Sequence, residues 1–167
     1  MRDDMLRTLS AVAILTVLGC GSRITSAAGA DQLSSMGGAE AALIFHLMDR
    51  YPPGDRVVCV GRRAATVDGL VAVDPEAHLL EQLRSAGYDA APGGECRLRD
   101  FAGPMLHMPT GREAVLYQTT VVRRLGTRVE LNGAYYAASL DGASCKYIVT
   151  LSDGAYIVTG ESDCAVS

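Results

Sequence analysis

Residues 140–158 read LDGASCKYIVTLSDGAYIV: two short runs of alternating apolar and polar residues, each introduced by the pair Asp-Gly. Asp141-Gly142 and Asp153-Gly154 are strong short-range signals of a tight hairpin turn. Placing each pair at the centre of a turn fixes which residues face one another across the strands. The predicted facing pairs are Leu140 with Ala143, Tyr136 with Tyr147, Val149 with Val158, and Leu151 with Tyr156.

This register separates the two faces of the predicted sheet. The facing pairs all lie on one apolar face together with Cys145, because side chains alternate along a strand. The opposite face is polar, and on it Lys146 is predicted to lie across from Glu161 as a favourable pair of opposite charges. One register therefore accounts for both faces.

Further strands precede this hairpin. Residues 114–124 (AVLYQTTVVRR) are rich in β-branched residues and predict a strand. Asn132-Gly133 is compatible with another tight turn or with a bulge in a longer strand. The bulge is favoured, because one extra residue shifts the alternation and moves Val129 and Leu131 to the apolar face.

Helices are predicted upstream of these strands. Residues 39–50 (AEAALIFHLMDR) repeat apolar residues at helical spacing, and the Pro and Gly residues at 52–54 end the helix. A short strand is expected at 56–60, followed by a second helix over 74–86 that Asp74 caps, Pro75 begins and Gly87 ends. Its inward residues are predicted to be Leu79, Leu80 and Leu83. Residues 89–113 are expected to be irregular.

The predicted fold class is α+β, with N-terminal helices packed on the apolar face of a C-terminal antiparallel β-meander. The two hairpin motifs at 140–142 and 152–158 resemble the final hairpins of small bacterial cystatin-like and nuclear-transport-factor-like domains. The stretch from Cys59 through Asp74-Pro75 to Cys96 resembles uncharacterised exported proteins of that kind. The resemblance implies a cystatin-like roll, and it assigns no catalytic residue, because such folds serve both enzymes and binding modules.

The N-terminus carries an export signal. Residues 10–18 (SAVAILTVL) form an uncharged apolar run, which is too short for a membrane span and has the length of a signal-peptide core. Thr16-Val17-Leu18-Gly19-Cys20 follows, and it resembles the bacterial lipobox. That resemblance implies cleavage after residue 19, lipidation of Cys20 with a diacylglycerol and an acyl chain such as palmitate, and anchorage to a membrane.

The expected organisation is therefore a signal peptide over 1–19, a lipidated Cys and flexible tether over 20–34, and one α+β domain over 35–167. Gly21 after the lipidated Cys implies the outer membrane, facing the periplasm, if the host is Gram-negative. A rival cleavage site of ordinary secretion, Ala28-Gly29-Ala30, would release a soluble protein. Translation from Met5 instead of Met1 would remove Asp3 and Asp4 and leave a basic start.

Cysteine number agrees with export. Of the five Cys residues, four remain once Cys20 is set aside, and an even number in an oxidising compartment predicts two disulfides. Three pairings of four cysteines are open. We favour the local pairing of Cys59 with Cys96 and of Cys145 with Cys164, although the second pair lies diagonally and needs a local distortion of the strands. No C-x-x-C spacing points to a metal.

The composition disfavours one class of function. The formal net charge is −4, Trp is absent and Phe occurs twice, which disfavours a nucleic-acid binder. We find no spacing that requires catalysis, a cofactor or a metal. Asp74, His78 and Glu81 share a helix stripe, and His107 lies between Met105 and Met108, a set of soft Cu(I)-type ligands; surface or packing roles are favoured for both groups. The expectation is a binding domain for a protein or small-ligand partner, and the alternative is a small cell-envelope enzyme with His78 or His107 as base.

Overall fold

The computed structural model describes residues 27–66, 69–100 and 103–167. Cys20, the predicted signal peptide and residues 20–26 of the predicted tether lie outside these ranges, and so the lipid anchor stays a prediction. Residues 27–34, which were predicted to be part of the flexible tether, are helical. The helices are α1 (Ala27–Arg50), α2 (Ala77–Ser85) and the short 3₁₀ helix η1 (Gly93–Glu95). The strands are β1 (Val57–Thr66), β2 (Gly69–Val73), β3 (Ala90–Pro92), β4 (Cys96–Leu98), β5 (Met105–His107), β6 (Arg112–Leu125), β7 (Arg128–Ala138), β8 (Asp141–Ser152) and β9 (Ala155–Val166).

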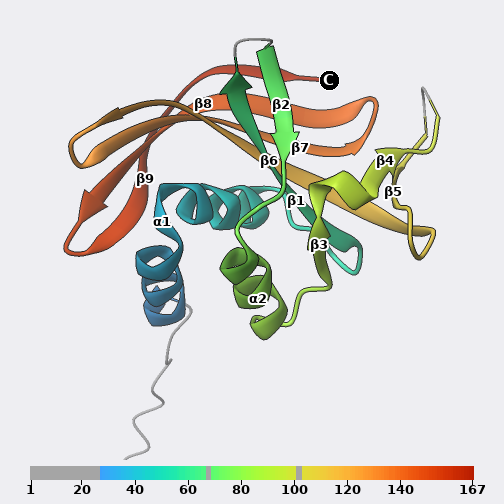
Figure 1. Ribbon diagram of the computed structural model, residues 1–167, viewed down its shortest axis with the longest axis horizontal. Coiled ribbons are helices and arrows are strands. Elements are labelled where there is room, and N and C mark those ends of the chain that lie inside the picture. The colour runs from blue at the N-terminus through green and yellow to red at the C-terminus, as the bar shows by residue number, and fades with distance from the viewer. Residues whose placement is uncertain (1–26, 67–68, 101–102) are drawn as a thin grey trace, which may run out of the picture.

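The predicted α+β class is confirmed. The main sheet has the strand order β2-β1-β6-β7-β8-β9, in which β6 to β9 form the expected antiparallel meander. The sheet is larger than predicted, because β1 runs on from the expected short strand, forms a hairpin with β2, and joins β6 in parallel. In Figure 1, α1 and α2 lie on the same side of the strongly twisted sheet.

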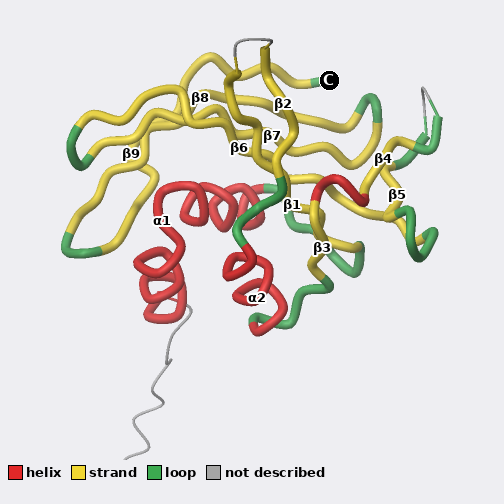
Figure 2. The backbone as a smooth tube through the Cα atoms, in the orientation of Figure 1, coloured by secondary structure: helices red, strands yellow, loops and turns green. Residues whose placement is uncertain are grey.

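The predicted apolar face of α1 is confirmed. Gly38 has φ +72°, a left-handed conformation that breaks the helix just before the predicted start at residue 39. The following segment runs along the sheet, and Figure 2 shows it as the helical layer beneath the strands. Its buried side chains include Leu43, Ile44, Leu47 and Met48.

Gly133 allows this helix to approach the sheet closely. A Cβ atom at Gly133 would lie 2.9 Å from Tyr147 Cε2 and 3.1 Å from Leu43 Cδ2. Carbon atoms make optimal contact at about 3.5–4.0 Å, and so any larger residue would displace Leu43 or Tyr147. The glycine therefore serves packing between α1 and β7.

The second helix is confirmed over most of its predicted length. Leu79, Leu80 and Leu83 are buried, and Gly87, at φ +91°, ends the helix with its N–H donating to the Arg84 carbonyl. The predicted Asp74 cap is wrong. The helix begins at Ala77 after an extended Glu76, and no side chain caps it, because the chain is still leaving β2 at positions 74–76.

The hairpin between β8 and β9 follows the predicted register near its turn. Asp153 and Gly154 both have positive φ, 52° and 83°, as a type I′ turn requires. Leu151 pairs with Tyr156, and Val149 pairs with Val158. Here the turn residues alone determined the pairing.

The register predicted between β7 and β8 is wrong. The turn consists of Ser139 and Leu140, so that Asp141-Gly142 lies within β8, Tyr136 pairs with Gly142, and Tyr147 pairs with Leu131. A Cβ atom at Gly142 would lie 2.9 Å from Tyr136 Cδ1, so the glycine makes room for an aromatic ring. The Asp-Gly pair was therefore misinterpreted as a turn.

The predicted bulge at Asn132-Gly133 is also wrong. Pairing of β6 with β7 is continuous from Leu116–Tyr136 to Val121–Leu131. Tyr135 is the tyrosine that faces α1, and Val129 and Leu131 then lie on the same face by simple alternation. The bulge was predicted because Tyr136 was wrongly assigned to the apolar face that α1 covers. With Tyr135 on that face, no extra residue is needed.

The Lys146–Glu161 pair is not formed. A register shift between Ile148 and Val149 places Glu161 across from Tyr147 instead. Lys146 Nζ lies 2.7 Å from Asp163 Oδ2, and this ion pair replaces the predicted one on the exposed surface. A bulge in the strand pair therefore overturned a prediction that a regular ladder would have satisfied.

Residues 89–113, which were predicted to be irregular, contain β3, η1, β4 and β5. They build a second core on the face of the sheet opposite α1, because β1 and β6 alternate between the two faces. Val58 and Val115 belong to the main core, and Val57 and Leu116 belong to the second. The members of the second core are Val57, Cys59, Ala91, Cys96, Met105, Ala114 and Leu116, with Tyr136 packed against them.

Two core tyrosines predict how stability depends on pH. Burial raises the pKa of Tyr147 to about 12 and raises that of Tyr117 as well, whereas an unfolded tyrosine has a pKa of about 10. The fold therefore favours the neutral phenol. The contribution of these groups is complete below pH 10 and is lost as the pH rises from 10 through the folded-state values.

We expect the free energy of unfolding, measured by urea denaturation, to fall as the pH is raised above 10. Tyr147→Phe should give a shallower fall, because the variant lacks one ionisable group. Tyr156→Phe is the matched control, since it removes the same hydroxyl group from a side chain that is only half-buried. An equal slope in the Tyr147→Phe variant and the wild type would contradict the assignment.

Candidate functional site

A half-open cavity of about 440 Å³ lies on the face of the sheet that α1 does not cover. Its floor comes from β6 and β7, one wall comes from β4 and β5, and the β7–β8 turn closes one end. The apolar lining residues are Leu98, Met105, Leu116, Tyr136, Ala138 and Leu140. A surface of this size and composition is typical of sites for small molecules.

The polar lining is sparse. Arg63 from β1 and Gln118 from β6 line the cavity together with Ser139. Gln118 pairs with Gly61, which lies two residues before Arg63, so the guanidinium and the carboxamide come from adjacent strands on one face. A Cβ atom at Gly61 would lie 3.4 Å from Gln118 Nε2, and so the glycine leaves room for the Gln118 side chain.

Arg63 differs from its neighbour Arg62. Arg62 Nε donates to Glu40 Oε1 at 2.8 Å, on the helix-covered side, and its guanidinium also lies 3.8 Å from Glu76. Arg63 has no hydrogen bond or ion pair with any residue that the structure describes. No acidic residue lines the cavity within the described ranges. The cavity therefore presents an apolar surface and an unneutralised cation.

A second, smaller cavity of about 150 Å³ shares the lining residue Tyr136 with this one. Its lining comes from the start of β8 and from the chain end at Ala165, Val166 and Ser167. Val166 is 81% exposed, as is Leu140 in the β7–β8 turn. The rims of both cavities thus carry exposed apolar side chains.

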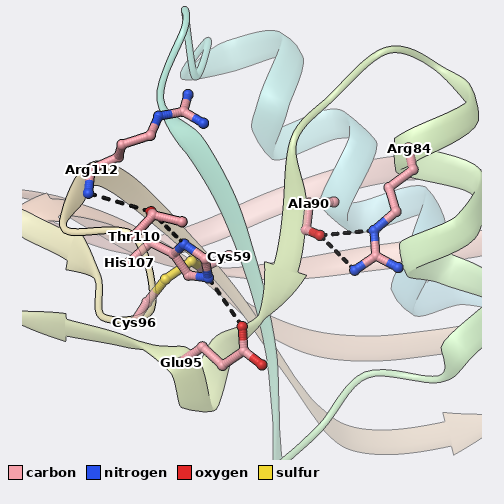
Figure 3. Close-up of a disulfide and its surroundings, with 8 residues drawn as sticks. All are labelled: Cys59, Arg84, Ala90, Glu95, Cys96, His107, Thr110 and Arg112. Carbon is pink, nitrogen blue, oxygen red and sulfur yellow. Dashed lines mark hydrogen bonds and ion pairs between the residues drawn. A yellow bond between two sulfur atoms is a disulfide. The ribbon is translucent and has the colours of Figure 1, made fainter.

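His107, one of the two candidate bases, is buried in a polar cluster beside the Cys59–Cys96 disulfide (Figure 3). Its Nδ1 lies 2.8 Å from Thr110 Oγ1, and its Nε2 lies 3.0 Å from Glu95 Oε2. If the ring donates to Glu95, its other nitrogen accepts the Thr110 hydroxyl proton, which is the relation of a base to a nucleophile. Glu95 and Thr110 are exposed, and none of the three residues lines the cavity of Arg63.

His78, the other candidate base, lies half-buried on α2. Its Nδ1 is 3.2 Å from Glu76 Oε2, while Asp74 and Glu81 are exposed. The predicted helix stripe of Asp74, His78 and Glu81 is therefore replaced by a local contact with Glu76. His78 does not line the cavity either.

The cysteines pair as favoured, Cys59 with Cys96 and Cys145 with Cys164. The first disulfide joins β1 to β4 in the second core. The second joins β8 to β9, and a register shift between Ser144 and Lys146 supplies the predicted distortion.

Glu161 lies beside the second disulfide. Its Oε1 is 3.2 Å from Cys145 Sγ and 2.9 Å from Cys164 Sγ, and its other carboxylate oxygen pairs with Arg50. These three side chains have metal-ligand spacing. Metal ions bind thiolates, however, and sulfurs joined in a disulfide are not thiolates, so the cluster is not a metal site while the bond is intact.

Sequence reasoning missed Arg63 and Gln118. The alternation of β1 and β6 could have placed each of them opposite the main core, but both strands were needed in register before they could be seen together. Leu98 and Met105 come from a segment that was predicted to be irregular, which hid the wall of the cavity.

Comparison with known proteins gives no assignment, because no protein-family model, no curated protein and no solved structure matches this chain. In the part of the chain that the structure describes, no helix is long and apolar enough to cross a membrane.

Proposed function

We propose that this chain is an exported, lipid-anchored binding domain, and that the 440 Å³ cavity holds a small ligand with a mainly apolar body. The cavity is the observation that carries the proposal. Its volume lies within the range of roughly 300–1,000 Å³ that is common for small-molecule sites. Six apolar residues and three polar ones line it, which favours binding by burial with a few orienting contacts.

A binding role is favoured over catalysis for this cavity because of its lining. Within the described ranges, no His, Cys, Asp or Glu contributes to it. General acid–base and nucleophilic catalysis rely mainly on such groups. The lining instead consists mainly of apolar side chains, with one cationic residue, Arg63.

The experiment measures binding of a neutral, environment-sensitive dye such as Nile red to the full chain. We expect saturable fluorescence enhancement in the wild type. Ala138→Phe fills the cavity and should weaken dye binding about tenfold, the loss that follows from about 1.4 kcal/mol of contact energy. Ala155→Phe is the matched control, because Ala155 begins β9, pairs with Ser152 at the far end of β8, and lies outside the cavity.

A second variant keeps the test informative if Ala138→Phe fails to fold. Leu140→Asp places a charge on the cavity rim at a side chain that is 81% exposed, so the fold should tolerate it while dye affinity falls. Absence of saturable binding by the folded wild type would overturn the proposal. Equal affinity in the wild type and in folded Ala138→Phe and Leu140→Asp would overturn the assignment to this cavity.

The cell-envelope location is part of the same proposal. The signal core at 10–18, the lipobox ending at Cys20 and the two disulfides support it. The intact mass of the protein from the membrane fraction should show a lipidated Cys20 N-terminus. A mature N-terminus at Asp31 would instead favour the soluble secreted form.

We also propose kinship with cystatin-like or nuclear-transport-factor-like domains. A helix that crosses one face of an antiparallel meander supports it, as does the β8–β9 hairpin. The parallel pairing of β1 with β6 is an addition that the hairpin motifs did not predict.

The alternative function is a small envelope enzyme with His107 as base. The contacts of His107 with Thr110 and Glu95 favour it over His78. An activated p-nitrophenyl ester tests the idea, because a Thr110 nucleophile would form an acyl-enzyme and release p-nitrophenol. The enzyme model expects His107→Gln and Thr110→Val to abolish hydrolysis and His78→Ala to preserve it. Equal rates in all four proteins would exclude it.

A further inference from the structure

We infer that the ligand of the 440 Å³ cavity is a single-chain amphipathic carboxylate of the fatty-acid type, with its head group on Arg63 and its chain on the floor made by Leu116 and Tyr136. This inference rests on the proposed function, since it names the chemical class that the cavity takes. Three features of the cavity carry it: the charge, the distribution of polar groups, and the apolar lining.

The charge of the site selects an anion. Arg63 is the charged residue in the described lining of the cavity, and it has no acidic partner among the described residues. The adjacent Arg62 is paired with Glu40, so the contrast between the two side chains does not come from a general lack of carboxylates nearby. A cationic ligand would be repelled by Arg63, whereas the exposed guanidinium can pair with an anionic head group at the edge of the apolar surface.

The single guanidinium favours a carboxylate over a phosphate. The planar fork of an arginine matches the two oxygens of a carboxylate in a bidentate arrangement. A phosphate monoester carries nearly two negative charges at neutral pH and is usually held by several donors. The described cavity offers one cation, with Gln118 as the neighbouring amide donor.

The remaining lining suits an unbranched apolar chain. Leu98, Met105, Leu116 and Tyr136 supply contacts that need no hydrogen bonds, and methionine adapts readily to a flexible chain. The second cavity, of about 150 Å³, shares Tyr136 with the first. A chain whose head is on Arg63 can lie along Leu116 and Tyr136 within the cavity.

The test compares ligands that share a chain and differ in the head. Decanoate, decanol and decyl phosphate each compete with bound Nile red on the full chain, at constant ionic strength and below their critical micelle concentrations. We expect decanoate to bind at least tenfold more tightly than decanol, because a hydrogen bond between a guanidinium and a carboxylate is roughly twice as strong as one to a neutral hydroxyl. Decyl phosphate should bind more weakly than decanoate.

Variants at Arg63 assign the head group. Arg63→Gln should weaken decanoate about tenfold and leave decanol unchanged, and Arg63→Lys should give an intermediate loss, because it keeps the charge without the fork. Arg124→Gln is the matched control: it makes the same charge change at an exposed position of β6 outside the cavity. Thermal unfolding of each variant checks that the fold is retained.

The outcomes separate this inference from the proposed function. If decanol competes as well as decanoate and Arg63→Gln changes neither, the carboxylate class is wrong and the binding cavity stands. If decyl phosphate binds most tightly and loses affinity in Arg63→Gln, the head group is a phosphate and the carboxylate is overturned. If the dye itself does not bind the folded wild type, the proposed function fails first.

Discussion

Replacing Cys59 and Cys96 together with alanine is expected to lower the free energy of unfolding by about 4 kcal/mol. The disulfide closes a sequence separation of 37 residues, and the chain-entropy model gives about this value for such a loop. The bond also lies within the second core, where Cys59 is fully buried and Cys96 is 7% exposed. Its loss would loosen the attachment of β4 to β1.

The Cys145–Cys164 disulfide closes a separation of 19 residues, for which the same model gives about 3 kcal/mol. The Cys145→Ala, Cys164→Ala double variant is thus the matched control for loop length. Urea denaturation of both variants measures the two losses. A smaller loss from the Cys59–Cys96 variant than from the Cys145–Cys164 variant would contradict the loop-length argument.

Accessibility predicts the order of reduction in the wild type. Cys164 is exposed, whereas both sulfurs of the other pair belong to buried residues. A dilute dithiol should therefore reduce Cys145–Cys164 first, since exchange requires access of the attacking thiolate to a sulfur. Timed alkylation followed by peptide mapping identifies the labelled cysteines.

Leu43→Ala is expected to destabilise the protein by about 2–5 kcal/mol, the usual range for a buried leucine that leaves a cavity. Leu43 is fully buried and reaches the place on β7 that Gly133 leaves open, beside the Tyr147 ring. Gly133 has no side chain that could fill the space left by the leucine. A loss toward the upper end of the range is therefore expected.

Leu140→Ala is the matched control for this substitution. It removes the same atoms from a side chain that is 81% exposed in the β7–β8 turn, and a change within about 0.5 kcal/mol is expected. Chemical denaturation of both variants gives the comparison. Equal losses would mean that α1 is not packed on the sheet through Leu43.

The cavity illustrates what sequence reasoning could and could not predict about the site. Cys59, Cys96, Cys145 and Cys164 were paired correctly, because each pair brackets one compact unit of the chain. Arg63 and Gln118 lie 55 positions apart and meet only because β1 pairs with β6 in parallel. No local pattern in either strand encodes that pairing.

The histidines also show which part of the site the sequence predicts and which part only the fold decides. Sequence reasoning could name His78 and His107 but could not rank them, since neither has a motif around it. Folding places His107 between Thr110 and Glu95 and leaves His78 beside Glu76. The ranking therefore came from contacts across a turn and between short strands.

Local chemistry in the sequence determined some of the helices and one of the hairpins. Helical spacing fixed the buried faces of α1 and α2, Gly87 fixed the end of α2, and Asp153-Gly154 fixed the hairpin of β8 and β9, because each depends on interactions within a few residues. The tertiary structure decided the rest. Glycines at 133 and 142 carry the same sequence signal whether they form turns or admit a neighbouring ring, and only the packing of Leu43 and Tyr136 distinguishes the two. Strand register depends on such packing, because side chains that are distant in the sequence must fill the same interior space without gaps or overlap. The cavity depends on the register in turn, since its lining comes from several strands.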